Sequence, residues 1–226
     1  EVAALGVTCW DIPFCRSPYD LQNVKAYQHL SRLIRDNHYE LIHVHTPNAA
    51  FLTRLAARGL SDTSVLYTAH GFHFYSGVPL KNWLTYYNAE RVAARWTSGL
   101  IVINQEDYMN ARRMGFKAGE NLFFVNGVGV PLEVYEPIHT EGASIRSELG
   151  IHERDCLITS VAELNRNKNH AFLLDAWARL SQDHFGVHLL LVGKGSQDDI
   201  LRQRVAQEGL ERVYFLGYRE DVPSIL

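Results

Sequence analysis

The sequence predicts an α/β protein made of two Rossmann-like halves, each with a parallel sheet. Short apolar runs alternate with amphipathic stretches through almost all of the 226 residues, which is typical of β-α-β units. Residues 127–143 interrupt this alternation and concentrate glycine and proline, as a linker or hinge would. We therefore expect a domain boundary near residues 135–140, with a first domain over 1–137 and a second over 138–226.

The first half contains four apolar runs of strand length. They predict strands over 41–45, 65–69, 100–103 and 122–126, with helices over 21–37, 48–58, 81–96 and 105–114. The last helix has the clearest ends, because Asn104 is a typical N-cap and Gly115 follows the final turn. Glu106 and Asp107 then lie in the first turn, where we expect them to act as capping and dipole partners.

The alternation restarts in the second half. It predicts strands over 156–161, 188–192 and 212–216, and helices over 144–149, 169–182 and 196–208. Short repeats and low-complexity tracts are not visible in the sequence, so the two halves are its internal organisation.

The composition, 46% hydrophobic and 21% charged, is that of an ordinary globular protein. The net charge is −3 and basic residues form no run, so we expect no nucleic-acid partner. Cys9, Cys15 and Cys156 have spacings that fit neither a zinc site nor a disulfide framework, which favours a reducing, cytoplasmic compartment. Membrane helices require roughly 20 consecutive apolar residues, and no stretch approaches that length.

The helix expected over 21–37 mixes basic and apolar residues. Lys25, Arg32 and Arg35 accompany an apolar set, which is typical of a solvated amphipathic helix. The apolar residues are Leu21, Val24, Leu30, Leu33 and Ile34. The alternative is a peripheral contact with a membrane surface.

A histidine follows the strand predicted over 65–69. In open α/β sheets ligands bind at the carboxyl ends of the strands, so His70 is a candidate site residue, and Gly71 lets the backbone turn there. The alternative is that His70 caps the strand by bonding a nearby carbonyl. The next four residues could floor a pocket for a flat or sugar-like ligand: Phe72, His73, Phe74 and Tyr75.

Two further histidines are rivals of His70. His43 and His45 alternate along the strand over 41–45 and therefore share one face, so one of them could belong to the core instead. The helix over 81–96 adds Trp83, Tyr86 and Tyr87, which at helical spacing are more often core than pocket.

The loops of the second half carry the residues expected of a phosphate site. Arg166 and Lys168 lie between a strand and a helix start, where unpaired backbone N–H groups and added positive charge favour an anion. The alternative is that both are solvated loop cations. Gly193 and Gly195 follow the next strand and would let the backbone approach a nucleotide closely.

The last strand is followed by Tyr218 and Arg219. These side chains could contact a nucleobase, and a surface role is the alternative.

Together these motifs resemble the retaining GT-B glycosyltransferases of family 4. The second half resembles their donor-nucleotide domain, and the first half resembles the acceptor domain of the members that assemble polysaccharides. The matching segments are 162–169, 192–195 and 215–221 in the second half, and 45–46, 68–75 and 82–96 in the first.

The resemblance implies two Rossmann-like domains facing each other across a cleft. A nucleotide diphosphate-sugar, expected to be a UDP-sugar, would bind the second domain, and a saccharide or lipid-linked acceptor the first. Transfer would retain the anomeric configuration without a metal or other cofactor, in the cytoplasm or at the inner face of the membrane. Lys168 would stabilise the leaving diphosphate, with Arg166 second, and His70 would hold a donor hydroxyl or the acceptor.

The same resemblance implies the remaining site residues. The donor side would include Arg166, Gly193, Gly195, Tyr218 and Arg219. The acceptor side would include His45, Gly71, His73 and Tyr75.

The sequence departs from the family pattern in three respects. Glu163 stands where many members have arginine, and a carboxylate there repels a diphosphate unless it points away. The paired-glutamate motif (Glu-x7-Glu) and the first strand with its glycine loop are not among these residues. We therefore expect an internal fragment of a longer enzyme, with little activity of its own.

Two other functions fit the same two-domain pattern. One is a sugar-nucleotide epimerase, which would release an altered nucleotide sugar or a free monosaccharide without an acceptor. The other is a non-catalytic sugar- or nucleotide-binding protein, which would bind its ligand without turnover.

Overall fold

The computed structural model describes residues 5–15, 17–135 and 145–226. The chain divides into two compact units, unit 1 up to Gly129 and unit 2 from Val130 onward. The boundary expected near 135–140 falls almost entirely on residues outside the described ones.

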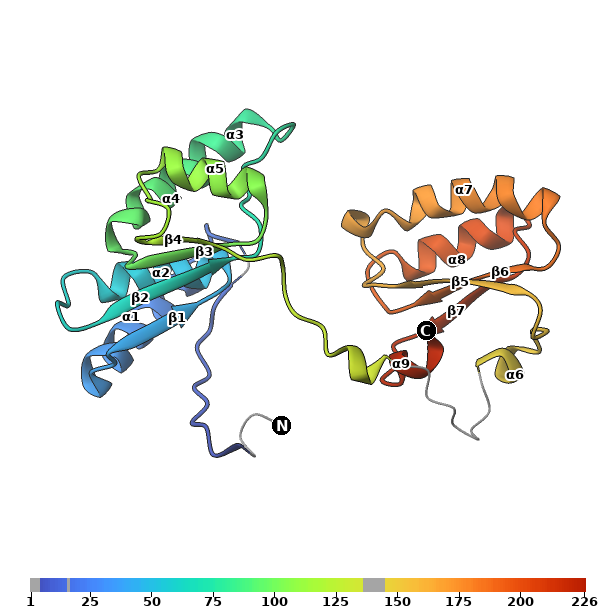
Figure 1. Cartoon of the computed structure of the whole chain (residues 1–226), viewed down its shortest axis with the longest axis horizontal. Coiled ribbons are helices and arrows are strands. Elements are labelled where there is room, and N and C mark those ends of the chain that lie inside the picture. Colours follow the sequence, from blue (N-terminus) through green and yellow to red (C-terminus); the bar gives the residue numbers. More distant parts are fainter. Residues whose placement is uncertain (1–4, 16, 136–144) are drawn as a thin grey trace. The chain divides into compact units, whose positions relative to one another are not determined.

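Unit 1 is built on a four-stranded parallel sheet whose strands follow one another in sequential order (Figure 1). The strands are β1 (Leu41–Val44), β2 (Ser64–Ala69), β3 (Gly99–Val102) and β4 (Leu122–Phe124). Each confirms a predicted strand, with ends shifted by at most two residues.

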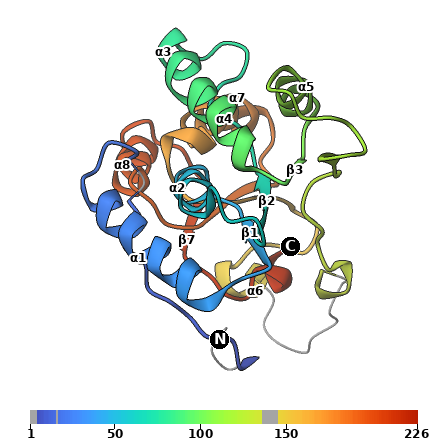
Figure 2. The same cartoon turned by 90° about the vertical axis from the view of Figure 1, so that its left-hand side faces the viewer.

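Five α-helices accompany this sheet: α1 (Gln22–Asn37), α2 (Pro47–Ala57), α3 (Leu80–Asn82), α4 (Asn88–Ala93) and α5 (Gln105–Arg113). The single helix predicted over 81–96 is a continuous run of short segments, with a π-helical turn (Trp83–Tyr87) before α4 and a 3₁₀ turn (Ala94–Trp96) after it. α1 packs against α2, and α2 packs against α4 (Figure 2).

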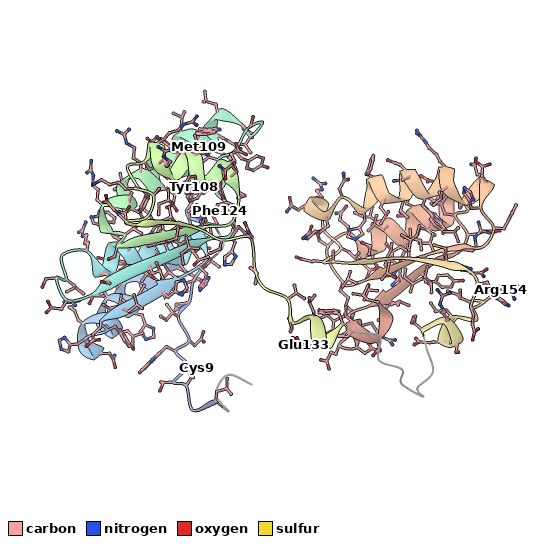
Figure 3. The ribbon with its side chains drawn as sticks, in the orientation of Figure 1. Cys9, Tyr108, Met109, Phe124, Glu133 and Arg154 are labelled. Atoms are coloured by element: carbon pink, nitrogen blue, oxygen red, sulfur yellow. The ribbon has the colours of Figure 1, made fainter. Side chains whose placement is uncertain are left out.

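The core of unit 1 lies on one face of the sheet. Tyr67 and Val102 point from the strands towards Ala50 of α2 and Ala111 of α5, and all four are buried. Right-handed crossovers between sequentially ordered parallel strands place the connecting helices on one face, which accounts for this arrangement. At the edge strand β4, Phe124 meets Tyr108 of α5 edge to face, with 6.0 Å between ring centroids (Figure 3).

A buried ion pair next to the core of unit 1 joins α2 to α4. The Arg54 guanidinium donates two hydrogen bonds to the Glu90 carboxylate, at 2.8 and 3.0 Å. The Arg54 side chain is 1% exposed and that of Glu90 10%. Arg54 also lies 4.4 Å from the centroid of the Tyr67 ring, a cation–π contact. α2 begins two residues after His45, so this pair helps to fix the segment that carries a candidate site residue.

Unit 2 contains a three-stranded parallel sheet in the order β5 (Cys156–Val161), β6 (Val187–Val192) and β7 (Val213–Gly217). Helices α7 (His170–Asp183) and α8 (Asp198–Gln207) cover one face, and α6 (Ile145–Leu149) and α9 (Val222–Ile225) lie on the other (Figure 1). Leu189 packs with Trp177 of α7, whereas Leu190 packs with Ile145 of α6. The continuous apolar run of β6 is therefore explained by burial on both faces.

The α/β class with parallel sheets is thus confirmed in both units. Among the described residues, the helices are too short or too polar to cross a membrane. On α1, Leu30 and Ile34 are buried while Lys25, Arg32 and Arg35 are exposed, which agrees with a solvated amphipathic helix packed on its own domain.

Candidate functional site

Three histidines meet at the carboxyl edge of the unit 1 sheet. His45 follows β1 and His70 follows β2, and the Nδ1 atom of His45 lies 3.0 Å from Nε2 of His70. The rings of His43 and His45 are 4.3 Å apart, and Nε2 of His43 is 2.8 Å from the Thr68 hydroxyl. His70 is thus paired with another imidazole, and not with the carbonyl of the alternative interpretation.

The segment after His70 divides its side chains between core and solvent. Gly71 has a φ of 134°, as the predicted turn requires. Phe72 and Phe74 are buried and stack 4.7 Å apart, so the expectation that these two rings floor a pocket is wrong. Both rings belong to the hydrophobic cluster of unit 1 that also contains Tyr67 and Ala69. His73 and Tyr75 are exposed.

Two carboxylates of α5 hold this segment in place. Asp107 accepts hydrogen bonds from the Phe72 N–H at 3.0 Å and from the Asn104 side chain at 2.8 Å, and burial raises its pKa. Glu106 accepts one from the Ser76 N–H at 2.6 Å. The predicted N-cap is confirmed, since the Asn104 side chain accepts from the Asp107 N–H. The hydrogen bonds that these carboxylates accept from the Phe72 and Ser76 N–H groups were not predicted. Nothing in the spacing of residues 104–107 reveals a partner some 30 residues away.

His73 lines a largely apolar groove of about 510 Å³ in unit 1. The groove lies between Phe14, Cys15 and Pro18, the start of α2 and the segment around α4. The His73 ring contacts the Tyr86 ring edge-on at 5.0 Å. The apolar walls of the groove are formed by Phe14, Pro18, Phe51, Leu52 and Tyr86. A groove of this size and lining suits a ligand with apolar parts.

The predicted phosphate loop of unit 2 is a 3₁₀ turn over Arg166–Lys168. The Asn165 side chain caps it by accepting from the Lys168 N–H at 3.1 Å. Arg166 and Lys168 are exposed, and neither belongs to an ion pair among the described residues. Both cations are therefore free to meet a ligand.

The Glu163 carboxylate has a hydrogen-bond partner within the same loop. It accepts a hydrogen bond from the Asn165 side-chain amide at 3.0 Å, and Asn165 in turn caps the turn that carries Lys168. The carboxylate that replaces the family arginine is thus part of the loop scaffold. Next to the loop, burial and the charge of Lys168 lower the pKa of His170, so this buried imidazole stays neutral over a wider pH range.

Gly193 and Gly195 follow β6, and the structure shows why no larger residue fits there. A Cβ atom on Gly193 would lie 2.0 Å from the Ala162 carbonyl oxygen, and one on Gly195 would lie 2.4 Å from that of Leu164. The close approach that requires glycine is therefore between two loops of the protein itself. Contact of these loops with a nucleotide stays a prediction.

These loops bring three strand ends together. The Leu164 N–H donates to the Lys194 carbonyl at 3.1 Å, and the Gly193 N–H donates to the Gly217 carbonyl at 2.7 Å. Lys194, which sequence reasoning missed, is an exposed cation whose Cε lies 3.5 Å from the position that a Cβ of Gly217 would occupy. A lysine between two glycines was the signal that could have found it.

Tyr218 and Arg219 lie just beyond β7. Tyr218 is 69% exposed, which leaves its ring available to a ligand. Arg219 donates hydrogen bonds to both Asp221 and Glu148, and these bonds raise its pKa and lower that of Asp221. The guanidinium thus ties the end of β7 to α6, a structural role that the sequence did not suggest, and its contact with a nucleobase stays a prediction.

Comparison with known protein families gives one match in each half of the chain. A family model described as "Glycosyl transferase 4-like domain" matches residues 1–127, and one described as "Glycosyl transferases group 1" matches residues 155–226. The Bacillus subtilis protein named "Putative glycosyltransferase EpsD" is 37% identical over 221 residues, 96% of this chain and 58% of its own length. An Escherichia coli α-1,3-galactosyltransferase, whose name specifies UDP-Gal and α-D-GlcNAc-diphosphoundecaprenol, is 26% identical over 94% of this chain and 56% of its own length.

Solved structures show the same fold. A glycosyltransferase from Rickettsia africae superposes with a TM-score of 0.63 at 13% identity, covering 94% of this chain and 55% of that one. The Listeria monocytogenes protein titled "putative UDP-N-acetylglucosamine 2-epimerase" superposes equally well, with a TM-score of 0.63 at 11% identity over 96% and 57% of the two chains. The structural likeness therefore shows the fold alone, and the chain spans a little over half the length of the curated relatives it matches. The two family models, which together take in most of both units, and the close relation to EpsD show that this chain belongs to the glycosyltransferase 4-like family of GT-B glycosyltransferases.

Proposed function

We propose that the protein transfers a hexosyl or N-acetylhexosaminyl group from a UDP-sugar to a saccharide or lipid-linked acceptor, with retention, during polysaccharide assembly. Membership of the family supports the reaction class. The names of two relatives support the donor and the acceptor, since one specifies UDP-Gal and both specify a diphosphoundecaprenol-linked substrate.

The observation that carries the donor proposal is the convergence of the three loops of unit 2. Hydrogen bonds join the loop after β5, which carries Arg166 and Lys168, to the loop after β6, which carries Lys194, and join that loop to the end of β7. Ligands of open parallel sheets bind beyond the carboxyl ends of the strands. Three positively charged side chains at this edge suit a diphosphate, whose negative charge grows as the sugar leaves.

In this mechanism Lys168 stabilises the leaving diphosphate, and Arg166 and Lys194 assist it. Positive groups held in advance where negative charge develops lower the barrier without reorganising during the reaction. Glu163 and Asn165 contribute by fixing the turn from which Lys168 extends. This chemistry places no demand on a metal ion.

In unit 1, His70 holds a hydroxyl of the sugar or of the acceptor. The apolar groove beside His73 takes the acceptor, since pyranose faces and isoprenoid chains both pack on aromatic rings. The polyprenyl part of a lipid-linked acceptor would keep the enzyme at the inner face of the membrane.

Replacing Lys168 by alanine is expected to weaken binding of UDP by about 10- to 100-fold, because a charge-assisted hydrogen bond contributes about 1.5–3 kcal/mol. Isothermal titration calorimetry measures the dissociation constant of the chain and of its variants. Arg112→Ala, which removes an exposed cation from α5 in unit 1, is the control and should bind UDP like the parent chain. An equal loss in both variants would contradict the assigned site.

The epimerase alternative has fold-level support only, since the two superposed structures whose titles name a UDP-N-acetylglucosamine 2-epimerase share 11% and 14% identity with this chain. Product analysis separates the two reactions. An epimerase changes the nucleotide sugar without an acceptor, whereas the transferase proposed here consumes the donor only when an acceptor is added.

A further inference from the structure

His45 and His70 share one proton between two ring nitrogens. Nδ1 of His45 and Nε2 of His70 are 3.0 Å apart, so one of them must carry the hydrogen and the other must accept it. The rings are nearly parallel, with 27° between their planes and 5.3 Å between centroids. Both side chains are exposed at the sheet edge, which leaves their outer nitrogens accessible.

The two arrangements of this proton are not equivalent. If His70 donates from Nε2, both neutral rings are Nε2–H tautomers, the form that an isolated imidazole side chain prefers. If His45 donates from Nδ1, both rings take the less favourable Nδ1–H form. The first arrangement is favoured because it gives both rings the preferred tautomer. Partial burial and the neighbouring His43 and His70 lower the pKa of His45, which favours its neutral form.

His43 is fixed separately and does not compete for this proton. Its Nε2 pairs with the Thr68 hydroxyl at 2.8 Å, and its ring lies 4.3 Å from that of His45. Among the described residues, Nε2 of His70 therefore has one hydrogen-bond partner, Nδ1 of His45.

We propose that His45 is the positioning residue of His70: it accepts the Nε2–H of His70, fixes the ring and its tautomer, and leaves Nδ1 of His70 as a hydrogen-bond acceptor for a ligand hydroxyl. The proposal rests on the proposed function for the nature of that ligand, a sugar hydroxyl. His45 therefore decides which hydrogen bond His70 offers to the sugar.

Nitrogen-15 NMR of histidine-labelled chain tests the proposal directly. At pH 8 we expect pyrrole-like Nε2 and pyridine-like Nδ1 shifts for both His45 and His70, with a scalar coupling across the hydrogen bond between them. His45→Phe keeps a ring but removes the acceptor, so the His70 shifts should move to the averaged values of a tautomer mixture. His45→Asn should restore the parent shifts, because its side-chain oxygen occupies the place of Nδ1.

The control is His29→Phe, which changes an exposed histidine on α1 and should leave the His70 signals unchanged. Averaged His70 shifts without coupling in the parent chain, or the same fixed tautomer in the parent and in His45→Phe, would overturn the proposal. The readout requires no turnover. A chain that shows the fixed tautomer but does not bind UDP would disprove the proposed donor and leave the histidine pair standing.

Discussion

Replacing Arg54 by alanine is expected to destabilise unit 1 by about 3–5 kcal/mol, the range found when one partner of a buried ion pair is removed. The substitution leaves the Glu90 carboxylate in a site where its side chain is 10% exposed, without the two hydrogen bonds it accepts from Arg54. It also removes the cation from the face of Tyr67. Urea unfolding, followed through amide NMR signals of unit 1, measures the change.

Two comparisons isolate the cause of this loss. Arg54→Met combined with Glu90→Leu replaces the pair by apolar side chains and should recover most of the stability, because the uncompensated charge is gone. Lys117→Ala breaks an exposed pair with Glu120 and should change stability by less than about 1 kcal/mol. If Arg54→Ala were as mild as Lys117→Ala, the pair would not stabilise the segment that begins after His45.

Replacing Gly193 by alanine is expected to distort the donor loops and to destabilise unit 2 by about 2–6 kcal/mol, because overpacking and an unfavourable backbone conformation each cost about 1–3 kcal/mol. The new Cβ atom would lie 2.0 Å from the Ala162 carbonyl oxygen, and neither group can rotate away because both belong to the backbone. The φ of 142° at Gly193 adds strain for any other residue. The free energy of unfolding, measured on signals of unit 2, and the affinity for UDP should both fall.

Gly209→Ala is the matched control. Gly209 also has a positive φ, 60°, but a Cβ atom there meets nothing within 4 Å, so only the backbone cost of about 1–2 kcal/mol is expected. Equal losses for the two variants would mean that the contact between the loops after β5 and β6 does not constrain the site.

Local patterns in the sequence predicted the elements and identified His43, His45 and His70 as candidate site residues, but they did not predict that the three rings contact one another. The apolar runs predicted the strands. In β6 the continuous run reflects burial on both faces of the sheet, whereas in unit 1 the core lies on one face. His45 and His70 could be expected at one edge, since parallel strands share their carboxyl edge. The cap at Asn104 depends only on residues within its own turn, so it could also be predicted from the sequence.

What the sequence did not reveal depends on partners distant along the chain. Arg219 pairs with Glu148, 71 residues away, and Arg54 pairs with Glu90, 36 residues away. No local pattern distinguishes such cations from ligand-binding ones, which is why Arg219 was assigned to the donor. Phe72 and Phe74 were misassigned for a related reason, because only the folded structure shows that both rings pack into the core of unit 1.

We propose that the loops after β5 and β6 of unit 2 bind the diphosphate of a nucleotide sugar. A titration of the labelled 226-residue chain with UDP, followed by amide NMR, locates the ligand directly. We expect the largest shifts at residues 163–168 and 193–196, with much smaller shifts in the Lys168→Ala variant. Saturating UDP that shifts only signals outside these loops, or none, would contradict the claim.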